Sequence, residues 1–208
     1  MKFNKRILYL IQQAGSLMEM PRTHKRSLGT TFDTVASHSF HTAIIAYCIA
    51  RMEKLSHEEA NKAMSMGLLH DLAEARTGDM DFVAKNYAKV DEEKAISDQF
   101  RDIDFGKDLE NTVTEYNDRK TLIAKCAKDA DSLEQMYQEW VLMWQGNNLA
   151  KQWFEGDFVH RVPYLLTESA KKLALNMKDS NPHKWWWTEF VEKGINYKHL
   201  NGSKAQTK

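Results

Sequence analysis

The sequence predicts an all-α fold. Only 3 prolines and 9 glycines interrupt its 208 residues, which favours long helices over a turn-rich β fold. Apolar residues recur at helical spacing through most of the chain, and no stretch shows the apolar–polar alternation of a half-buried strand. The length suits one domain. We therefore expect a single domain over residues 1–200 and a flexible tail over residues 201–208.

The N-terminal elements surround a basic loop. Residues 3–14 carry an amphipathic helical pattern. A loop is expected over residues 16–33, and a loop of this length in a helical protein is often functional. A helix should begin near Thr34 and run to about Ala50. It is apolar on most sides, so we expect it to be central.

Caps and apolar spacing mark the helices that follow. Ser56 and Glu59 form a capping box, which begins a helix that runs to about Asp71. Helical pattern continues over residues 79–104, 107–117 and 119–145.

The C-terminal part is expected to be less regular. Asn147-Asn148 and Gly156 predict looser segments. Helices are expected within residues 163–195, the last of them after the cap and first-turn proline of Asn181-Pro182.

Charge and composition exclude some classes of function. The 29 basic and 29 acidic side chains cancel, so no net field favours a nucleic acid polymer or anionic lipid. No segment approaches the ~20 apolar residues of a membrane span. Cys48 and Cys126 sit in apolar helical patterns and are expected to be small buried residues in a reducing compartment. These features predict a cytoplasmic protein.

The dipeptide His70-Asp71, at the end of an apolar stretch, is the most informative motif. His38 precedes it, Glu74 follows one turn later, and Asp131 lies much further on. Taken singly, each has a plain structural explanation, such as a hydrogen-bonded core histidine or a solvated helix end. Two imidazoles and two carboxylates brought together, however, form a site for a divalent metal ion. Such an ion can activate water and hold a phosphate.

The motifs resemble those of a known family in order and separation. The matching stretches are Pro21-Arg22-Thr23, Val35-Ala36-Ser37-His38-Ser39, Leu69-His70-Asp71-Leu72-Ala73-Glu74, Thr77-Gly78-Asp79, Glu115-Tyr116 and Lys128-Asp129-Ala130-Asp131-Ser132-Leu133. Together they are similar to the HD-domain phosphohydrolases, and specifically to their 5′-deoxynucleotidase branch. The resemblance implies a single HD-domain helical bundle, with its metal-site core over about residues 34–135. It also implies that the ligands are His38, His70, Asp71 and Asp131.

Periodicity and resemblance differ on the last ligand. The apolar stripe of the long helix is centred near Ala130, and Asp129 lies about 80° from it against about 120° for Asp131. Periodicity therefore slightly favours Asp129, whereas the register of the family favours Asp131. We follow the register.

The resemblance also suggests roles around the ion. Glu74 and Asp71 are the expected catalytic carboxylates, because Glu74 stands one turn beyond the ligand pair and can exchange protons with water or the leaving group. Arg22 is the expected phosphate clamp, since a guanidinium meets phosphate in a two-point fork. Asp79 and Glu115 complete the expected substrate-binding set. The family usually has an acid where Ser37 stands, so we expect a weaker helix start there.

These expectations define one function and two rivals. The predicted activity is metal-dependent hydrolysis of (deoxy)nucleoside 5′-monophosphates by a homodimer. The ligand set suits Mn, Co, Zn, Fe or Ni alike. One rival is an HD phosphohydrolase for nucleoside triphosphates, cyclic nucleotides or alarmones. The other is a nucleotide-binding or scaffold protein without turnover.

Overall fold

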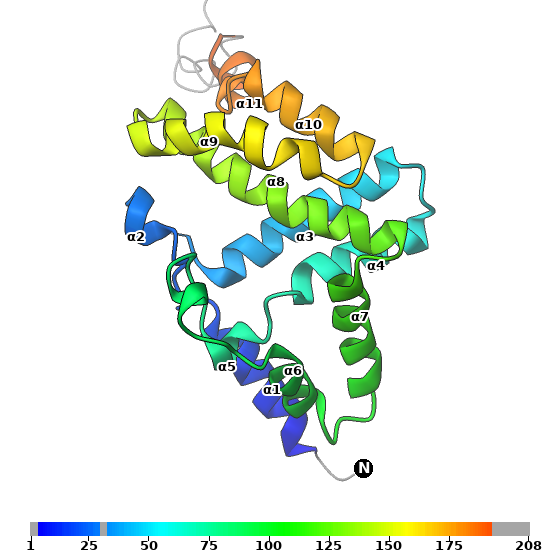
Figure 1. Cartoon of the computed structure of the whole chain (residues 1–208). Helices are drawn as coiled ribbons and strands as arrows, with labels where there is room; N and C mark the ends of the chain where they lie inside the picture. Colours follow the sequence, from blue (N-terminus) through cyan, green and yellow to red (C-terminus); the bar gives the residue numbers. More distant parts are fainter. Residues whose placement is uncertain (1–3, 30–32, 193–208) are drawn as a thin grey trace, which may run out of the picture.

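The computed structural model describes residues 4–29 and 33–192, and within them all regular secondary structure is helical (Figure 1). The N-terminal half contains α1 (Lys5–Ser16), α2 (Lys25–Leu28), α3 (Val35–Met52), α4 (His57–Leu69) and α5 (Glu74–Thr77). There follow a 3₁₀ turn (Ala84–Asn86), α6 (Glu92–Phe100), α7 (Gly106–Asp118) and α8 (Leu122–Trp144). The chain continues with α9 (Asn148–His160), a 3₁₀ turn (Val162–Tyr164), α10 (Glu168–Lys178), α11 (Lys184–Trp186) and a π-helical segment (Trp187–Glu192). The predicted all-α class is confirmed.

Capping boxes begin both α4, where the sequence predicted one, and α3, where the sequence predicted a weaker helix start. At α4, Ser56 Oγ accepts from Glu59 N at 3.2 Å and Glu59 Oε2 accepts from Ser56 N at 2.8 Å. At α3, Ser37 Oγ accepts from Thr34 N at 2.8 Å, so the serine completes the box that an acid was expected to complete. Each box satisfies two amides that the first turn would otherwise leave without partners.

The helices enclose two apolar clusters. The larger lies among α3, α4, α8, α9 and α10 and includes Met66 and Leu133. The smaller lies among α1, α6 and the start of α3, and includes Val35 and Leu72. In Figure 1, α1, α5 and α6 are grouped at the opposite end of the molecule from α9 and α10.

The chain passes from one cluster to the other at the predicted metal ligands. Met66 belongs to the larger cluster and Leu72 to the smaller, and His70-Asp71 lies between them. On α3, Val35 packs in the smaller cluster and Ala46 in the larger, and His38 lies between those two. The polar side chains of His38 and of His70-Asp71 therefore lie at the boundary between the two apolar clusters.

The crossing of α3 and α4 depends on a small residue. A Cβ at Gly67 would lie 3.0 Å from Ala43 Cα, which is backbone and cannot move aside cheaply. Glycine therefore lets α4 approach α3 closely, and this approach brings the C-terminal end of α4 to the start of α3.

Several expected elements differ in the structure. The chain does leave helical structure between α8 and Asn148, where a looser segment was expected, but the loose segment expected at Gly156 is wrong, because α9 runs through that position. The side chain of Asn147 caps this helix, and a lone glycine costs only about 1 kcal/mol, which packing of Phe154 offsets. Only residues 92–100 of the helical pattern at 79–104 form an α-helix.

Three further expectations have separate outcomes. Cys126 is buried, but Cys48 is exposed, so its predicted burial is wrong. The tail at 201–208 and the end of the C-terminal helices at 193–195 lie outside the described residues, and the single domain over 1–200 stays a prediction. No helix in the described ranges is both long and apolar enough to cross a bilayer.

Candidate metal centre

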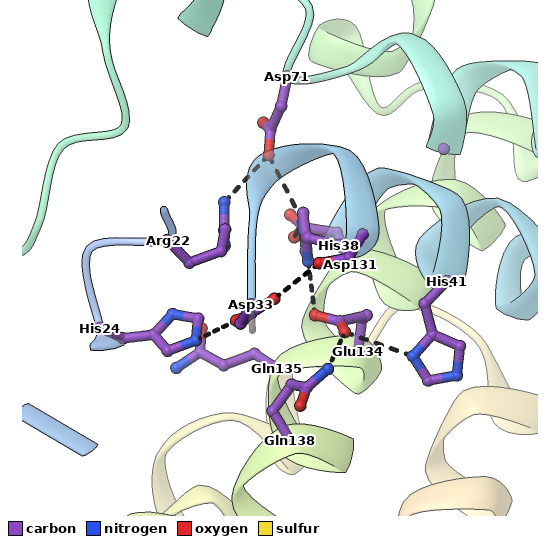
Figure 2. A network of polar contacts seen from close by, with 12 residues as sticks. Arg22, His24, Asp33, His38, His41, Asp71, Asp131, Glu134, Gln135 and Gln138 are labelled. Carbon is purple, nitrogen blue, oxygen red and sulfur yellow. Dashed lines mark hydrogen bonds and ion pairs between the residues drawn. The ribbon is translucent and has the colours of Figure 1, made fainter. Parts of the chain in front are cut away.

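Three separate helices bring the predicted ligands together. His38 lies in the first turns of α3, His70 directly follows the last residue of α4, and Asp131 lies in the middle of α8. Asp71 follows His70 in the turn that leads to α5. Figure 2 shows Asp71 and Asp131 close to the ring of His38.

The donor atoms of these residues converge on one point. His38 Nε2 lies 3.2 Å from His70 Nε2, 3.2 Å from Asp131 Oδ1 and 3.5 Å from Asp71 Oδ2. His70 Nε2 lies 3.2 Å from Asp71 Oδ2 and 3.8 Å from Asp131 Oδ1. Adjacent ligands of an ion with bonds of about 2.1 Å stand about 3 Å apart, so this donor set fits a transition-metal ion.

The second nitrogen of each imidazole has its own acceptor. His38 Nδ1 donates to Glu134 Oε2 at 2.5 Å, and His70 Nδ1 donates to the carbonyl of Gly67 at 2.8 Å. These hydrogen bonds place the proton on Nδ1 and leave the lone pair of Nε2 for a cation. This is the usual support of a metal-binding histidine.

The carboxylates make the centre favourable for positive charge. Burial opposes ionisation of both imidazoles. Nevertheless, hydrogen bonds to Asp131 and Glu134 raise the pKa of His38 to about 9. The pKa of His70 rises to about 10, chiefly through Asp71 and Asp131. Against the effect of burial, His70 holds the pKa of the Asp71 carboxyl down at about 2. A buried point that holds positive charge this strongly suits a divalent cation.

Arg22 and Asp79 border the centre on the side of the N-terminal loop. Arg22 Nη1 lies 3.1 Å from Asp71 Oδ2 and 3.9 Å from Asp79 Oδ2. Asp79 Oδ2 also accepts from the Thr23 amide at 2.6 Å, and so fastens the loop that carries Arg22. Within the described residues, Arg22 Nε is buried and has no hydrogen-bond partner. This donor is available for an anionic ligand.

Glu74 lines the same cavity as the centre. Burial, together with the charges of Asp71 and Asp79, raises the pKa of Glu74 to about 8. Its Oε2 is buried and has no hydrogen-bond partner among the described residues. A carboxyl group that titrates near neutral pH can both give and take a proton.

Most of these residues line a cavity of about 570 Å³. Besides His70, Asp71, Asp131 and Glu74, its walls include Arg22, Asp79, Tyr116, Lys128, Gln135, Trp153 and Arg161. The volume is in the range of sites for small organic ligands, and the walls combine acidic side chains with basic ones, among them Arg22, Lys128 and Arg161.

Glu115 does not join this group. Its carboxylate lies 2.5 Å from Lys62 Nζ and accepts from Thr121 Oγ1 at 2.8 Å, and Glu115 is not a lining residue of the cavity. Its neighbour Tyr116 does line the cavity, and its hydroxyl donates to Asp131 Oδ2 at 3.0 Å. A substrate-binding role for Glu115 gains no support from this position.

Asp129 and Asp131 occupy different environments. Asp131 Oδ1 faces the two imidazoles. Asp129 is buried on another side of α8, where its Oδ2 accepts from Thr167 N and Thr167 Oγ1, both at 2.7 Å, and its Oδ1 accepts from Leu166 N at 2.9 Å. Asp129 therefore holds the start of α10, and periodicity favoured it because that position is also buried.

Replacing Asp129 by alanine should lower stability and spare the metal centre. The change removes the acceptor of two buried backbone amides and a hydroxyl, so we expect unfolding to become easier by about 2–4 kcal/mol. Urea unfolding measures the loss, and metal content measured on the folded variant should equal that of the parent protein. If Asp129→Ala kept its stability but lost the ion, Asp129 rather than Asp131 would be the metal ligand.

Glu134 is a residue of the centre that the sequence analysis missed. It is fully buried, and besides His38 it holds His41 Nδ1 at 3.3 Å and Gln138 Nε2 at 2.9 Å (Figure 2). The available signal was its spacing, since Glu134 follows Asp131 by three residues and therefore shares its side of the helix. Lys128 was missed in the same way, and its Nζ lies 2.7 Å from Asp131 Oδ2.

Replacing Glu134 by glutamine should weaken metal binding. The amide cannot match the charge that holds the His38 imidazole, so we expect a 10–100-fold loss of affinity. Titration calorimetry with Mn or Co measures this loss. Glu155→Gln, an exposed change on α9, serves as the control. Equal affinity of the Glu134→Gln and control variants would show that Glu134 does not support the ligand.

Comparisons with known proteins agree with this centre. The sequence model of the HD domain matches residues 14–173. This chain belongs to the HD domain family. The family predicted from the motifs is thereby confirmed, and the His38, His70 and Asp71 cluster of this HD-domain protein can hold a metal ion.

Individual relatives of this HD-domain protein are distant. One is a protein of Dictyostelium discoideum named 5′-deoxynucleotidase HDDC2, which is 28% identical over 134 residues, 60% of this chain and 70% of the relative. A structural-genomics crystal structure is 31% identical, with a TM-score of 0.66, and the match covers 88% of this chain and 99% of the other. A conserved hypothetical protein from Pyrococcus furiosus is 21% identical with a TM-score of 0.68, covering 83% and 99%, and it shares the fold.

Proposed function

We propose that this HD-domain protein hydrolyses (deoxy)nucleoside 5′-monophosphates to nucleoside and phosphate, with a divalent metal ion held by His38, His70, Asp71 and Asp131. The observation that carries the proposal is the convergence of these four donor atoms beside a cavity that Arg22 and Glu74 also line. The name of the Dictyostelium relative supports the same substrate class.

The chemistry of each side chain in the cavity suggests its role in the proposed reaction. When bound, the ion would supply a Lewis acid and lower the pKa of a coordinated water. Arg22 would bind the phosphate with its buried Nε–H and its Nη groups, since a guanidinium fits phosphate in a two-point fork. Asp79 would position the sugar from the same loop, which it already fastens through Thr23.

Glu74 would exchange the proton. Its Oε2 has no partner among the described residues and borders the same cavity as Arg22. In the protonated form it can give a proton to the leaving 5′-oxygen, and in the ionised form it can take one from water. Ester cleavage needs both events in each cycle, one when the P–O bond breaks and one when the attacking water loses its proton.

Hydrolysis of a panel of substrates tests the proposal, with released phosphate assayed and the nucleoside and nucleotide products separated by chromatography. The panel contains ribo- and deoxynucleoside 5′-monophosphates, triphosphates and cyclic nucleotides, with metal-stripped protein resupplied with Mn, Co, Zn, Fe or Ni. Metal-dependent release from 5′-monophosphates is the expected result. Turnover of triphosphates or cyclic nucleotides alone would favour a different phosphohydrolase, and binding without turnover by the folded protein would favour a scaffold role.

The cytoplasmic location and the homodimer expected from the sequence belong to the same proposal. Sedimentation of the purified protein tests the dimer, and a single species at the mass of one chain would remove it from the proposal.

A further inference from the structure

The cavity that contains the metal centre is also lined by polar and aromatic side chains that the proposed chemistry does not use. Gln135 comes from α8, Trp153 comes from α9, and Arg161 directly follows α9. In Figure 1 these two helices lie side by side, and in Figure 2 Gln135 leaves α8 on the side of His24, away from Glu134. His24 lines the same cavity.

The spacing of these residues sets their distance from the centre. Gln135 follows Asp131 by four residues, so it shares the same side of α8 and lies about 6 Å further along the helix. Trp153, Asp157 and Arg161 are each four residues apart and share one side of the α9 segment. The offset along α8 is comparable to the span of a pentose between a phosphate and its base.

Two buried carboxyl groups beneath this wall orient its polar side chains. Glu139 Oε1 accepts from Gln135 Nε2 at 3.0 Å, and Asp157 Oδ1 accepts from Arg161 Nε at 2.9 Å. Both acids are buried. Burial and the charge of Asp157 raise the pKa of Glu139 to about 8.

These anchors leave a defined set of groups for a ligand. The amide oxygen of Gln135 and the terminal nitrogens of Arg161 have no hydrogen bond to any described residue. Gln135 therefore offers an acceptor, Arg161 offers donors, and the half-buried Trp153 offers an aromatic face. The three side chains line the same cavity as the residues of the metal centre.

We propose that Gln135, Trp153 and Arg161 form a recognition wall for the nucleobase of the substrate, and that this wall determines which nucleotides the protein selects. The inference rests on the proposed function and names the part of the substrate that these three side chains contact. Trp153 stacks on the base, which any base permits. Arg161 donates to a carbonyl oxygen of the base edge, and Gln135 accepts from an N–H group of it.

This chemistry predicts a base preference. Guanine, cytosine, thymine and uracil each carry a carbonyl oxygen and an N–H donor, whereas adenine has no carbonyl oxygen. A wall of one guanidinium and one amide acceptor therefore disfavours adenine. The Asp157 carboxylate beneath Arg161 argues against a second phosphate there, since it already balances the guanidinium charge.

Steady-state kinetics on substrates with and without a nucleobase test the proposed recognition wall. The substrates are deoxyribose 5-phosphate, which has no base, and the 5′-monophosphates of the four deoxynucleosides. We expect KM of the parent protein to be at least 10-fold lower for deoxyguanosine monophosphate than for deoxyribose 5-phosphate, and deoxyadenosine monophosphate to be the poorest nucleotide. Trp153→Leu should raise KM for every nucleotide, whereas Arg161→Met should remove the discrimination against adenine. Neither should change kcat/KM for deoxyribose 5-phosphate.

Matched variants control for general damage. Trp185→Leu removes an exposed tryptophan of α11, and Lys151→Met removes one positive charge from the exposed face of α9. Both should match the parent protein on every substrate. Circular dichroism checks that each variant is folded.

Equilibrium dialysis of the same compounds separates this inference from the proposed function. Base-dependent binding without hydrolysis would refute the phosphatase and keep the wall. Equal KM and equal binding for deoxyribose 5-phosphate and the nucleotides would overturn the wall and leave the phosphatase standing. Unchanged base preference in folded Arg161→Met and Trp153→Leu proteins would overturn it as well.

Discussion

Replacing Asp71 by alanine should abolish metal binding and phosphate release and leave the helical fold intact. Asp71 Oδ2 lies 3.2 Å from His70 Nε2 and 3.5 Å from His38 Nε2, so its loss opens the ligand set and removes a charge that stabilises a cation. If the ion contributes several kcal/mol to the transition state, activity falls by about 10³-fold or more. Elemental analysis gives the metal content, and phosphate release gives the rate.

The matched control for this change is Asp129→Ala. It also removes a carboxylate, but one whose partners are at the start of α10. The two variants should therefore show opposite patterns, with lost metal and kept stability for Asp71→Ala, and kept metal and lost stability for Asp129→Ala. Unchanged metal content and turnover in Asp71→Ala would remove Asp71 from the metal centre.

Replacing Glu74 by glutamine should remove proton transfer and keep the metal. The amide has nearly the same shape but cannot exchange a proton, so we expect kcat to fall by about 10²–10⁴-fold. Metal content should not change, because the four predicted ligands are untouched. A kcat within a factor of about two of the parent value would contradict the proton-transfer role of Glu74.

The same variant has a second readout that does not depend on activity. Burial and the charges of Asp71 and Asp79 raise the pKa of Glu74 to about 8, above the value of an unfolded chain. The folded state then binds a proton that the unfolded state has lost, so stability falls as pH rises from about 4.5 towards 8. With a chelator present to remove metal ions, the stability of Glu74→Gln should not fall in this way as pH rises. At pH 8 its melting temperature should therefore be higher than that of the parent protein. At pH 4, where both states are protonated, the two melting temperatures should agree.

The sequence alone was enough for the features that depend on neighbours along the chain. The all-α class follows from the spacing of apolar residues and the scarcity of proline and glycine. The two helix starts at Thr34 and Ser56 follow from side chains that reach only three residues ahead. The family, too, could be identified from short motifs in order, and the match over residues 14–173 confirmed it.

Features that depend on distant segments needed the structure. The sequence analysis did not predict α9. The packing of Phe154 against other helices and the cap at Asn147 stabilise this helix by more than its one glycine destabilises it. The sequence analysis did not identify Glu134 because its role depends on the contact with His38. The two residues are 96 positions apart in the chain, so spacing along one helix does not reveal this contact.

Asp129 and Asp131 show the difference between what local sequence determines and what tertiary packing determines. Both acids follow the same apolar stripe on one helix, and periodicity measures only their angle from its centre. What each carboxylate does depends on which segment packs against its side, the start of α10 for Asp129 and the two histidines for Asp131. The sequence determined the direction of each carboxylate from the apolar stripe, and only the packing of α3, α4 and α10 around α8 decided which partner each would meet. The physical reason is that local spacing sets a direction from the helix axis, while the partner in that direction comes from elsewhere in the chain.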